Sequence, residues 1–340
     1  MTSSRTLVIA CCALMAACSA RAVLQDASGT LRVVAQEALP SDATKAAECV
    51  AKLLAQHESA TVVVALDAMA WDALRAANPK SKDDRGLRVV AIGDSLPSVD
   101  QHSALDSIIV ATTGAAVAVD LALLASHGIE LPKQVALGTR TVTAANAAAG
   151  GAPRLAPGDL GMEMLRRQHT EVLTTTPSTD VIFKIALVQM RAAAGFDERL
   201  REEVKAASKR YPQLELVCYD AAGDATRFVA LVTQCITENL RAVLLSADDW
   251  SMLASIETKV NEHRYEQKIA LIALDPMVAV AGATCSVGSD QAILGRAAGE
   301  ALRALLPTGG DVLVLSTQTP ASRTAARLQG FVDALGLRAN

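Results

Sequence analysis

From residue 31 onward, short apolar runs alternate with longer amphipathic stretches, and this alternation constrains the fold more than any other feature. The short runs are rich in Val, Ile and Leu and have no polar face, which is typical of parallel strands covered by helices on both sides. The longer stretches repeat apolar residues three and four apart, which is the spacing of a surface helix. Strands that alternate with helices predict βαβ units in doubly wound parallel sheets.

Ten runs have this strand pattern, and they form two series. The first series is Leu31–Ala35, Val62–Leu66, Leu87–Ile92, Ile108–Ala111 and Gln134–Leu137. The second series is Ile185–Gln189, Leu214–Cys218, Ala242–Leu245, Ile269–Leu274 and Val312–Leu315. Two series require two sheets, and 340 residues suit two ordinary domains. The predicted fold class is therefore α/β, with two Rossmann-like lobes.

The segment at residues 146–180 separates the two series and is rich in Ala, Gly, Pro and Thr. Such a composition favours turns and connections over packed elements. We expect a linker there, with room for one short helix at Met162–His169.

The first 25 residues have the pattern of an export signal. Arg5 gives a positive start, and the apolar run Leu7–Ala17 is shorter than the roughly 20 residues that a membrane-spanning helix needs. Small residues precede Cys18 as in a lipoprotein signal, in which the cysteine is lipidated. The alternative is a soluble signal cleaved near Ala20 or Ala22. Both alternatives place the mature chain in the periplasm, and a lipidated Cys18 would anchor it to the membrane.

The composition argues against several classes of function. The net charge is −4 and no basic stripe occurs, so binding to nucleic acid is not expected. The sequence has no G-x-S-x-G, P-loop or H-E-x-x-H motif, so we expect no catalytic residue and no cofactor. The four cysteines beyond the leader lack metal-ligand spacing, so no metal site is predicted, while their pairing in disulfides stays open; they are Cys49, Cys218, Cys235 and Cys285.

Residues 181–335 resemble the opening part of the type I periplasmic binding proteins of the ribose-binding kind, and of the related LacI-type sugar-binding domain. The resemblance is carried by IALVQMRAAAGFDERL, IALIALDP, VGSDQAILGRAAGEAL and TPASRTAARLQGFVDAL, in this order and at the family's spacing. The block that begins LRVVAQEALPSDATKAAECVAKLLAQ resembles the part that follows these segments in the family, yet it comes first here. The chain therefore resembles a circular permutant, which is tolerated where chain termini lie close together.

The resemblance also implies two interleaved lobes with a hinge that lets them close on a ligand. One lobe would hold residues 31–113, 132–145 and 290–340, and the other would hold residues 114–131 and 181–289. The chain would cross between them near Ser289–Gln291, Thr112–Gly114 and Leu131–Lys133.

A ligand is expected in the cleft at the carboxyl ends of the strands, where loops and helix starts converge. By the resemblance, Phe196 takes a position that stacks on a sugar ring, and Asp275 takes that of an aspartate that grips hydroxyls. Core packing is the alternative for Phe196, and a helix cap is the alternative for Asp275. Family positions or strand ends supply the other candidate ligand-binding residues, which are Ser246, Asp249, Asp67, Thr112, Gln36 and Asp94.

The chain departs from the family where sugars are gripped. The family's Asp-Arg pair is Asp275-Pro276 here, and an arginine near the last helix falls on Ala325. Loss of these forked donors makes a typical aldopentose an unexpected ligand.

The predicted function is that of a monomeric solute-binding protein that takes a sugar-like small molecule and delivers it to an ABC permease. The alternatives are a component that signals to a membrane sensor, or a lipid-anchored interaction protein that kept the fold and lost the sugar site.

Overall fold

A computed structural model describes residues 24–26, 30–40, 42–77, 87–93, 105–174, 182–192, 196–238, 240–247, 249–253, 256, 269–275, 280–317 and 321–339. The chain divides into two compact units. Unit 1 comprises Met1–Ala111, Thr139–Arg154 and Gln291–Asn340, and unit 2 comprises Thr112–Gly138 and Leu155–Asp290.

Unit 2 is built on a six-stranded sheet in which every neighbouring pair is parallel. Its order is β10-β9-β11-β12-β13-β6. Strands β11 and β12 are buried along their whole length, as the apolar character of both faces predicts. The bounds are β6 Gln134–Leu137, β9 Phe183–Gln189, β10 Leu214–Asp220, β11 Ala242–Ser246, β12 Ala270–Leu274 and β13 Cys285–Ser289.

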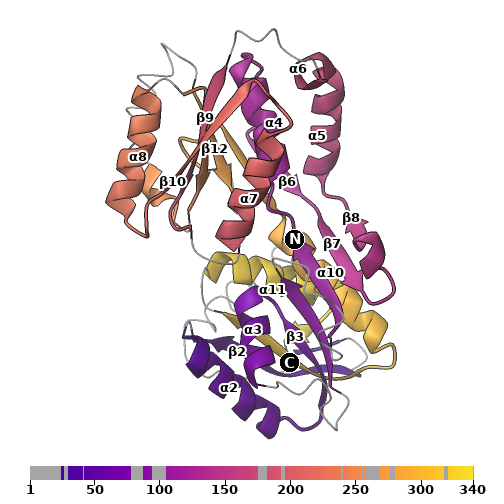
Figure 1. Cartoon of the computed structure of the whole chain (residues 1–340). Helices are drawn as coiled ribbons and strands as arrows, with labels where there is room; N and C mark the ends of the chain where they lie inside the picture. Colours follow the sequence, from indigo (N-terminus) through magenta and orange to yellow (C-terminus); the bar gives the residue numbers. More distant parts are fainter. Residues whose placement is uncertain are drawn as a thin grey trace, which may run out of the picture. The chain divides into compact units, whose positions relative to one another are not determined.

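Helices cover both faces of this sheet. Ile185 and Leu187 of β9 pack on the side of α4 (Ala115–Ser126) and α7 (Phe196–Ser208), which lie side by side in Figure 1. Ala186 and Val188 face the other way, against α8. The alternation of side chains along a strand thus serves two cores. The other helical elements that the described part of unit 2 provides are α5 Pro157–Gln168, α6 Thr170–Thr174, α8 Ala225–Thr237 and η3 Ser251–Leu253.

Unit 1 contains a nine-stranded sheet with the order β15-β1-β2-β14-β3-β4-β5-β7-β8. The five strands from β2 to β5 in this order are parallel, and the pairs at both edges are antiparallel. The bounds are β1 Leu24–Gln25, β2 Leu31–Leu39, β3 Ala60–Ala65, β4 Arg88–Gly93, β5 Leu105–Ala111, β7 Thr139–Thr143, β8 Ala152–Arg154, β14 Gly310–Thr317 and β15 Arg338–Ala339.

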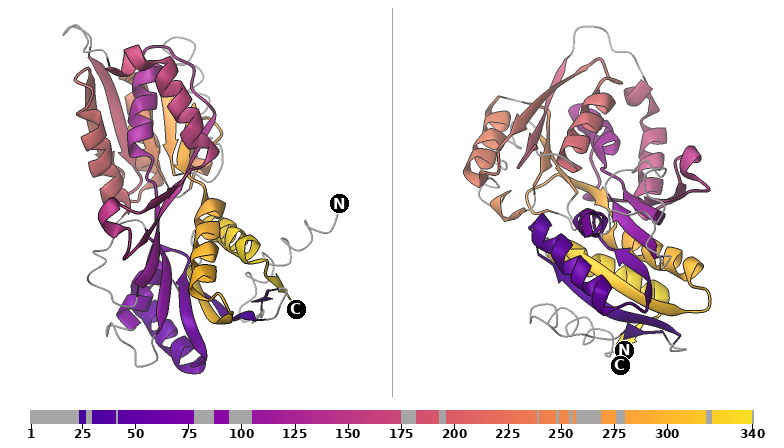
Figure 2. Two further views of the ribbon diagram at one scale, coloured as in Figure 1. Left: turned by 90° about the vertical axis from the view of Figure 1, so that its right-hand side faces the viewer. Right: turned by 60° about the horizontal axis from the view of Figure 1, so that its bottom comes forward.

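One face of the unit 1 sheet packs against α2 (Ala43–Gln56) and α3 (Ala68–Ala77), and the other packs against α10 (Gln291–Leu305) and α11 (Ala321–Leu335). Both views in Figure 2 show α10 and α11 side by side. The short helix η2 (Ala147–Ala149) lies between β7 and β8 in the chain.

The two sheets share one strand order. Counted along the chain from β9, the first five strands of unit 2 lie in the order second, first, third, fourth, fifth. Unit 1 shows the same order only when β14 is counted first and followed by β2, β3, β4 and β5. The late strand β15 also pairs with β1, so residues near the two ends of the chain are hydrogen-bonded neighbours.

The structure confirms the predicted α/β fold, and each of the ten predicted strands overlaps an observed one. The linker predicted at residues 146–180 is wrong, because β8, α5 and α6 lie within it. Its expected helix begins earlier, at Pro157, since proline is favoured in the first turn of a helix. The four cysteines beyond the leader are free.

The expected lobe boundary near Leu131–Lys133 is also wrong. Strand β6 was expected with the first lobe, but it pairs in parallel with β13 inside unit 2, and the chain crosses later, between Gly138 and Thr139. Strands β1, β7, β8, β13 and β15 were not predicted. The strand β13 reads CSVGS, which lacks the Val/Ile/Leu density of the other runs.

Glycines permit the close packing of α10 on α11. A Cβ atom at Gly295 would overlap the backbone oxygen of Arg327, and one at Gly330 would overlap that of Ala292. In contrast, a Cβ at Gly161 of α5 would meet nothing within 4 Å.

We predict that Gly295→Ala lowers the free energy of unfolding by about 2 kcal/mol, because the helices must separate to admit the methyl group. Gly161→Ala is the matched control and should stabilise the protein by about 0.5–1 kcal/mol through helix propensity. Urea unfolding of both variants measures the difference. Equal effects of the two substitutions would contradict the observed α10–α11 packing.

Candidate functional site

Polar residues end three adjacent strands of unit 2. Gln189 closes β9 and Ser246 closes β11, and the two are register partners. Ser246 also pairs with Leu274 of β12, which Asp275 follows directly. All three side chains therefore lie at the carboxyl edge of one parallel sheet, where open α/β folds bind ligands.

The first turn of α7 adds a carboxylate to this edge. The Gln189 Nε2 atom donates to the backbone oxygen of Asp197 at 2.8 Å, and the Ser246 hydroxyl donates to Asp197 Oδ1 at 3.4 Å. Gln189 is fully buried, and its Oε1 atom has no hydrogen-bond partner among the described residues. A buried acceptor without a donor costs about 1–3 kcal/mol, so a water or other molecule that supplied a donor to this atom would be stabilised there.

Asp275 has a backbone conformation that few residues adopt. Its φ is 55°, in the left-handed region that costs other side chains about 1–2 kcal/mol and that aspartate tolerates comparatively well. Its N–H donates to the oxygen of Val287 on β13 at 2.7 Å, and the residue is only 8% exposed. Backbone strain of this kind concentrates at functional sites.

Two other predicted aspartates accept hydrogen bonds from neighbouring protein groups. Asp249 is exposed, and its two oxygens accept from the N–H and the hydroxyl of Ser251, which lowers the pKa of the carboxyl group. Asp67 is buried in unit 1, and its two oxygens accept from the N–H groups of Ala70 and Thr317. Asp67 thus caps α3 and ties β3 to the end of β14.

The remaining predicted ligand residues are dispersed. Thr112 donates through its hydroxyl to the oxygen of Gly138, and it is exposed. Gln36 is half-buried on β2 of unit 1. The backbone of Phe196 begins α7, while its side chain, Asp94 and Cys18 lie outside the described residues.

Sequence reasoning missed Gln189 and Asp197 as members of this edge. Gln189 completes an apolar strand, so the pattern alone placed it in the core. Its amide is the one strongly polar side chain in the run IALVQ, and this was the available signal. Asp197 fitted the first turn of a helix, where acids are common without any ligand.

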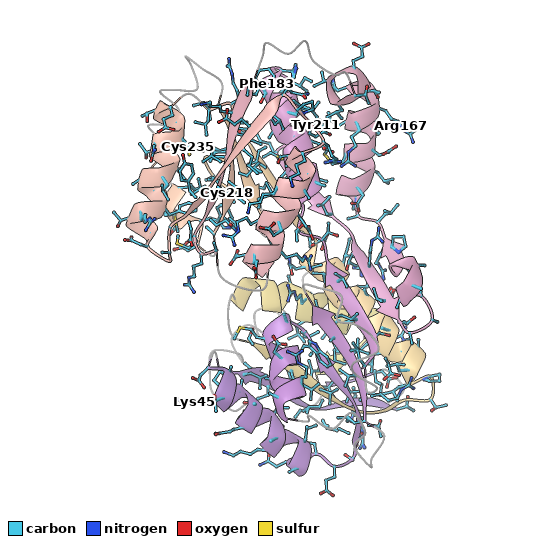
Figure 3. The ribbon with its side chains drawn as sticks, in the orientation of Figure 1. Lys45, Arg167, Phe183, Tyr211, Cys218 and Cys235 are labelled. Atoms are coloured by element: carbon cyan, nitrogen blue, oxygen red, sulfur yellow. The ribbon has the colours of Figure 1, made fainter. Side chains whose placement is uncertain are left out.

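A second buried carboxylate, Asp120 of α4, serves packing. It accepts from Arg166 of α5, from Arg210 and from the hydroxyl of Tyr211. Burial, followed by the hydrogen bond to Asp120, raises the pKa of Tyr211 to about 12. Figure 3 shows Tyr211 beside α4. These contacts join α4, α5 and the end of α7, and every oxygen of Asp120 has a protein donor.

Within the described residues, no group of three or more His, Cys, Asp or Glu side chains is placed to hold a metal ion. Nor is any helix in that part of the chain long and apolar enough to cross a membrane.

Residues 185–338 match the family model for the periplasmic binding protein domain. The match confirms the predicted resemblance to periplasmic binding proteins over this part of the chain. No curated protein sequence matches the chain.

The solved structures to which the chain is similar include two ABC transporter solute-binding proteins and one carbohydrate transporter solute-binding protein. One, from Mycobacterium smegmatis with bound glycerol, is 22% identical over 45% of this chain and 52% of its own, with a TM-score of 0.36. One from Agrobacterium radiobacter in complex with D-arabinose is 15% identical; the match covers 81% of this chain and 78% of the other, with a TM-score of 0.41. One from Burkholderia graminis in complex with D-arabinose is 10% identical; the match covers 83% of this chain and 81% of the other, with a TM-score of 0.44. The chain spans about half the length of the Mycobacterium protein.

Proposed function

We propose that this chain is an exported solute-binding protein that takes a sugar-like small molecule at the carboxyl edge of unit 2 and delivers it to an ABC permease. The observation that carries the proposal is the polar edge formed by Gln189, Asp197, Ser246 and Asp275 on one parallel sheet. The family match over residues 185–338 supports the same function. Export through residues 1–25 and lipidation at Cys18 belong to this proposal.

The chemistry of the edge favours a ligand rich in hydrogen-bond donors. Its described groups are two carboxylates, an amide oxygen and a hydroxyl, which accept donors from the hydroxyls of a sugar or polyol. Binding, rather than catalysis, is the activity that this set supports.

A second candidate is an interaction or sensing protein that kept the fold and lost its ligand. It is favoured by unit 1, where polar residues near the carboxyl edge bond within the unit. The Asp67 oxygens accept backbone N–H groups, and Arg327 donates to Gln291 and to the backbone oxygen of Leu66.

The two candidates separate in thermal melts against sugars, polyols, amino sugars and nucleosides. A ligand present at 100 times its Kd should add about 2.7 kcal/mol of stability. Ser246→Ala removes a hydroxyl, and Asp275→Asn replaces an acceptor oxygen with an NH2 donor that cannot accept from a ligand hydroxyl, so each should weaken binding of that ligand about tenfold. Glu198→Gln, an exposed neighbour on α7, is the control and should bind normally. The absence of any shift across the panel would reject the solute-binding function in favour of the second candidate.

We also propose that the chain is a circular permutant. The proposal is supported by the strand order of unit 1, which matches that of unit 2 only from β14, and by the pairing of β15 with β1. In an unpermuted chain, α11 would lead directly into β2.

This proposal predicts that the chain can be reconnected. Joining Ala339 to Leu24 through a short Gly/Ser linker, and opening the chain within residues 175–181, should give a protein that unfolds cooperatively at a midpoint within a few degrees of the original. Circular dichroism during heating measures this midpoint. A rejoined chain that fails to fold cooperatively would refute the permutation.

A further inference from the structure

The chain passes between the two units four times, and one passage follows the short strand β8. The passages lie between Ala111 and Thr112, Gly138 and Thr139, Arg154 and Leu155, and Asp290 and Gln291. The third falls inside the segment whose sequence predicted a linker. Its structure is instead a strand and a helix separated by only two residues, Leu155 and Ala156.

On the unit 2 side, hydrogen bonds tie three of the passages together. The Ser289 hydroxyl accepts from the N–H of Thr112 at 2.9 Å and lies 2.8 Å from its oxygen. The Thr112 hydroxyl donates to the oxygen of Gly138 at 3.0 Å. The residues next to the first, second and last passages are thus joined in one network.

Asp159 brings the remaining passage into this network. Its Oδ2 atom accepts from the N–H of Gly138 at 2.8 Å and from the N–H of Ala156 at 2.7 Å. A charged acceptor shared by two backbone donors makes stronger bonds than a neutral one. Asp159 therefore fixes the start of α5 to the end of β6.

The segment is also held firmly at both of its ends. Arg154 makes a two-pronged ion pair with Glu300 of α10, which raises the pKa of the guanidinium and lowers that of the carboxyl group. Beyond the passage, Gly158 packs so closely that a Cβ would overlap the backbone of Ala136, and Arg166 pairs with the buried Asp120.

We propose that residues 152–168 form a rigid strap across the third passage, with Asp159 as the clasp that makes the four passages bend together. The hydrogen bonds that the Asp159 carboxylate accepts, rather than the length of the connecting chain, then limit bending between the units. The strap is a feature of the chain without any ligand, so it stands apart from the proposed binding function.

The test compares Asp159→Ala, which removes the acceptor, with Asp159→Asn, which keeps an acceptor oxygen. Glu163→Ala is a control on the same helix, where Glu163 is exposed and pairs with Arg167. Amide hydrogen exchange at Gly138 and Ala156 shows whether their N–H groups are still hydrogen-bonded to residue 159. Bending between the units is measured by pulsed EPR as the distribution of distances between two spin labels. The labels are attached at Lys45→Cys of unit 1 and Ala206→Cys of unit 2. The partly buried native cysteines are replaced by Cys49→Ser and Cys218→Ser, so that they do not take up label.

We expect Asp159→Ala to accelerate exchange at both amides about tenfold or more and to broaden the distance distribution between the labels. Asp159→Asn keeps a neutral acceptor and should accelerate exchange less than Asp159→Ala does, while Glu163→Ala should behave like the parent chain. Unchanged exchange in Asp159→Ala would overturn the clasp, and fast exchange with an unchanged distance distribution would overturn the strap.

Glu300→Gln tests the strap from its unit 1 end in case Asp159→Ala fails to fold. The Arg154–Glu300 pair is partly exposed, so its loss should leave the unfolding midpoint nearly unchanged. The distance distribution should broaden in this variant as well. A distribution as narrow as that of the parent chain would contradict the proposal.

Discussion

The structure depends on the central position of β14 in the sheet of unit 1. This strand is formed by residues 310–317, near the end of the chain, yet it hydrogen-bonds β2 on one side and β3 on the other. Seven of its eight residues are buried. Without β14, β2 would lose its parallel neighbour and the apolar faces of both strands would meet water. Unit 1 is therefore complete only when the two ends of the chain have come together.

The same need for distant partners explains what the sequence predicts and what it does not. Runs such as Val62–Leu66 identify strands because both faces are apolar, and this information is local. The sheet to which a strand belongs is a long-range property, so β6 was expected in the wrong lobe although its bounds were right. The strap escaped prediction because Pro157, Gly158 and Asp159 also form a common turn sequence. Their role as a helix start appears only when Gly158 packs on β6 and Asp159 finds the N–H of Gly138.

The candidate site was predictable to a similar extent. The rule that ligands gather at the carboxyl ends of parallel strands led to Ser246 and Asp275, which lie on neighbouring strands. The same rule led to Asp67, where the structure shows a helix cap instead, because both functions place an aspartate after a strand. Gln189 was missed since the pattern of a buried strand hides a polar residue at its last position. Only the packed structure shows that its amide holds the first turn of α7.

The carboxyl edge of unit 2 is the surface that we propose binds a donor-rich small molecule. The most direct test of this proposal is amide hydrogen exchange with and without a ligand that stabilises the protein. We expect slower exchange in the peptides that contain Gln189, Asp197, Ser246 and Asp275, with little change at the amino ends of β9, β11 and β12. Protection confined to those amino ends, or to helices away from the carboxyl edge, would contradict it.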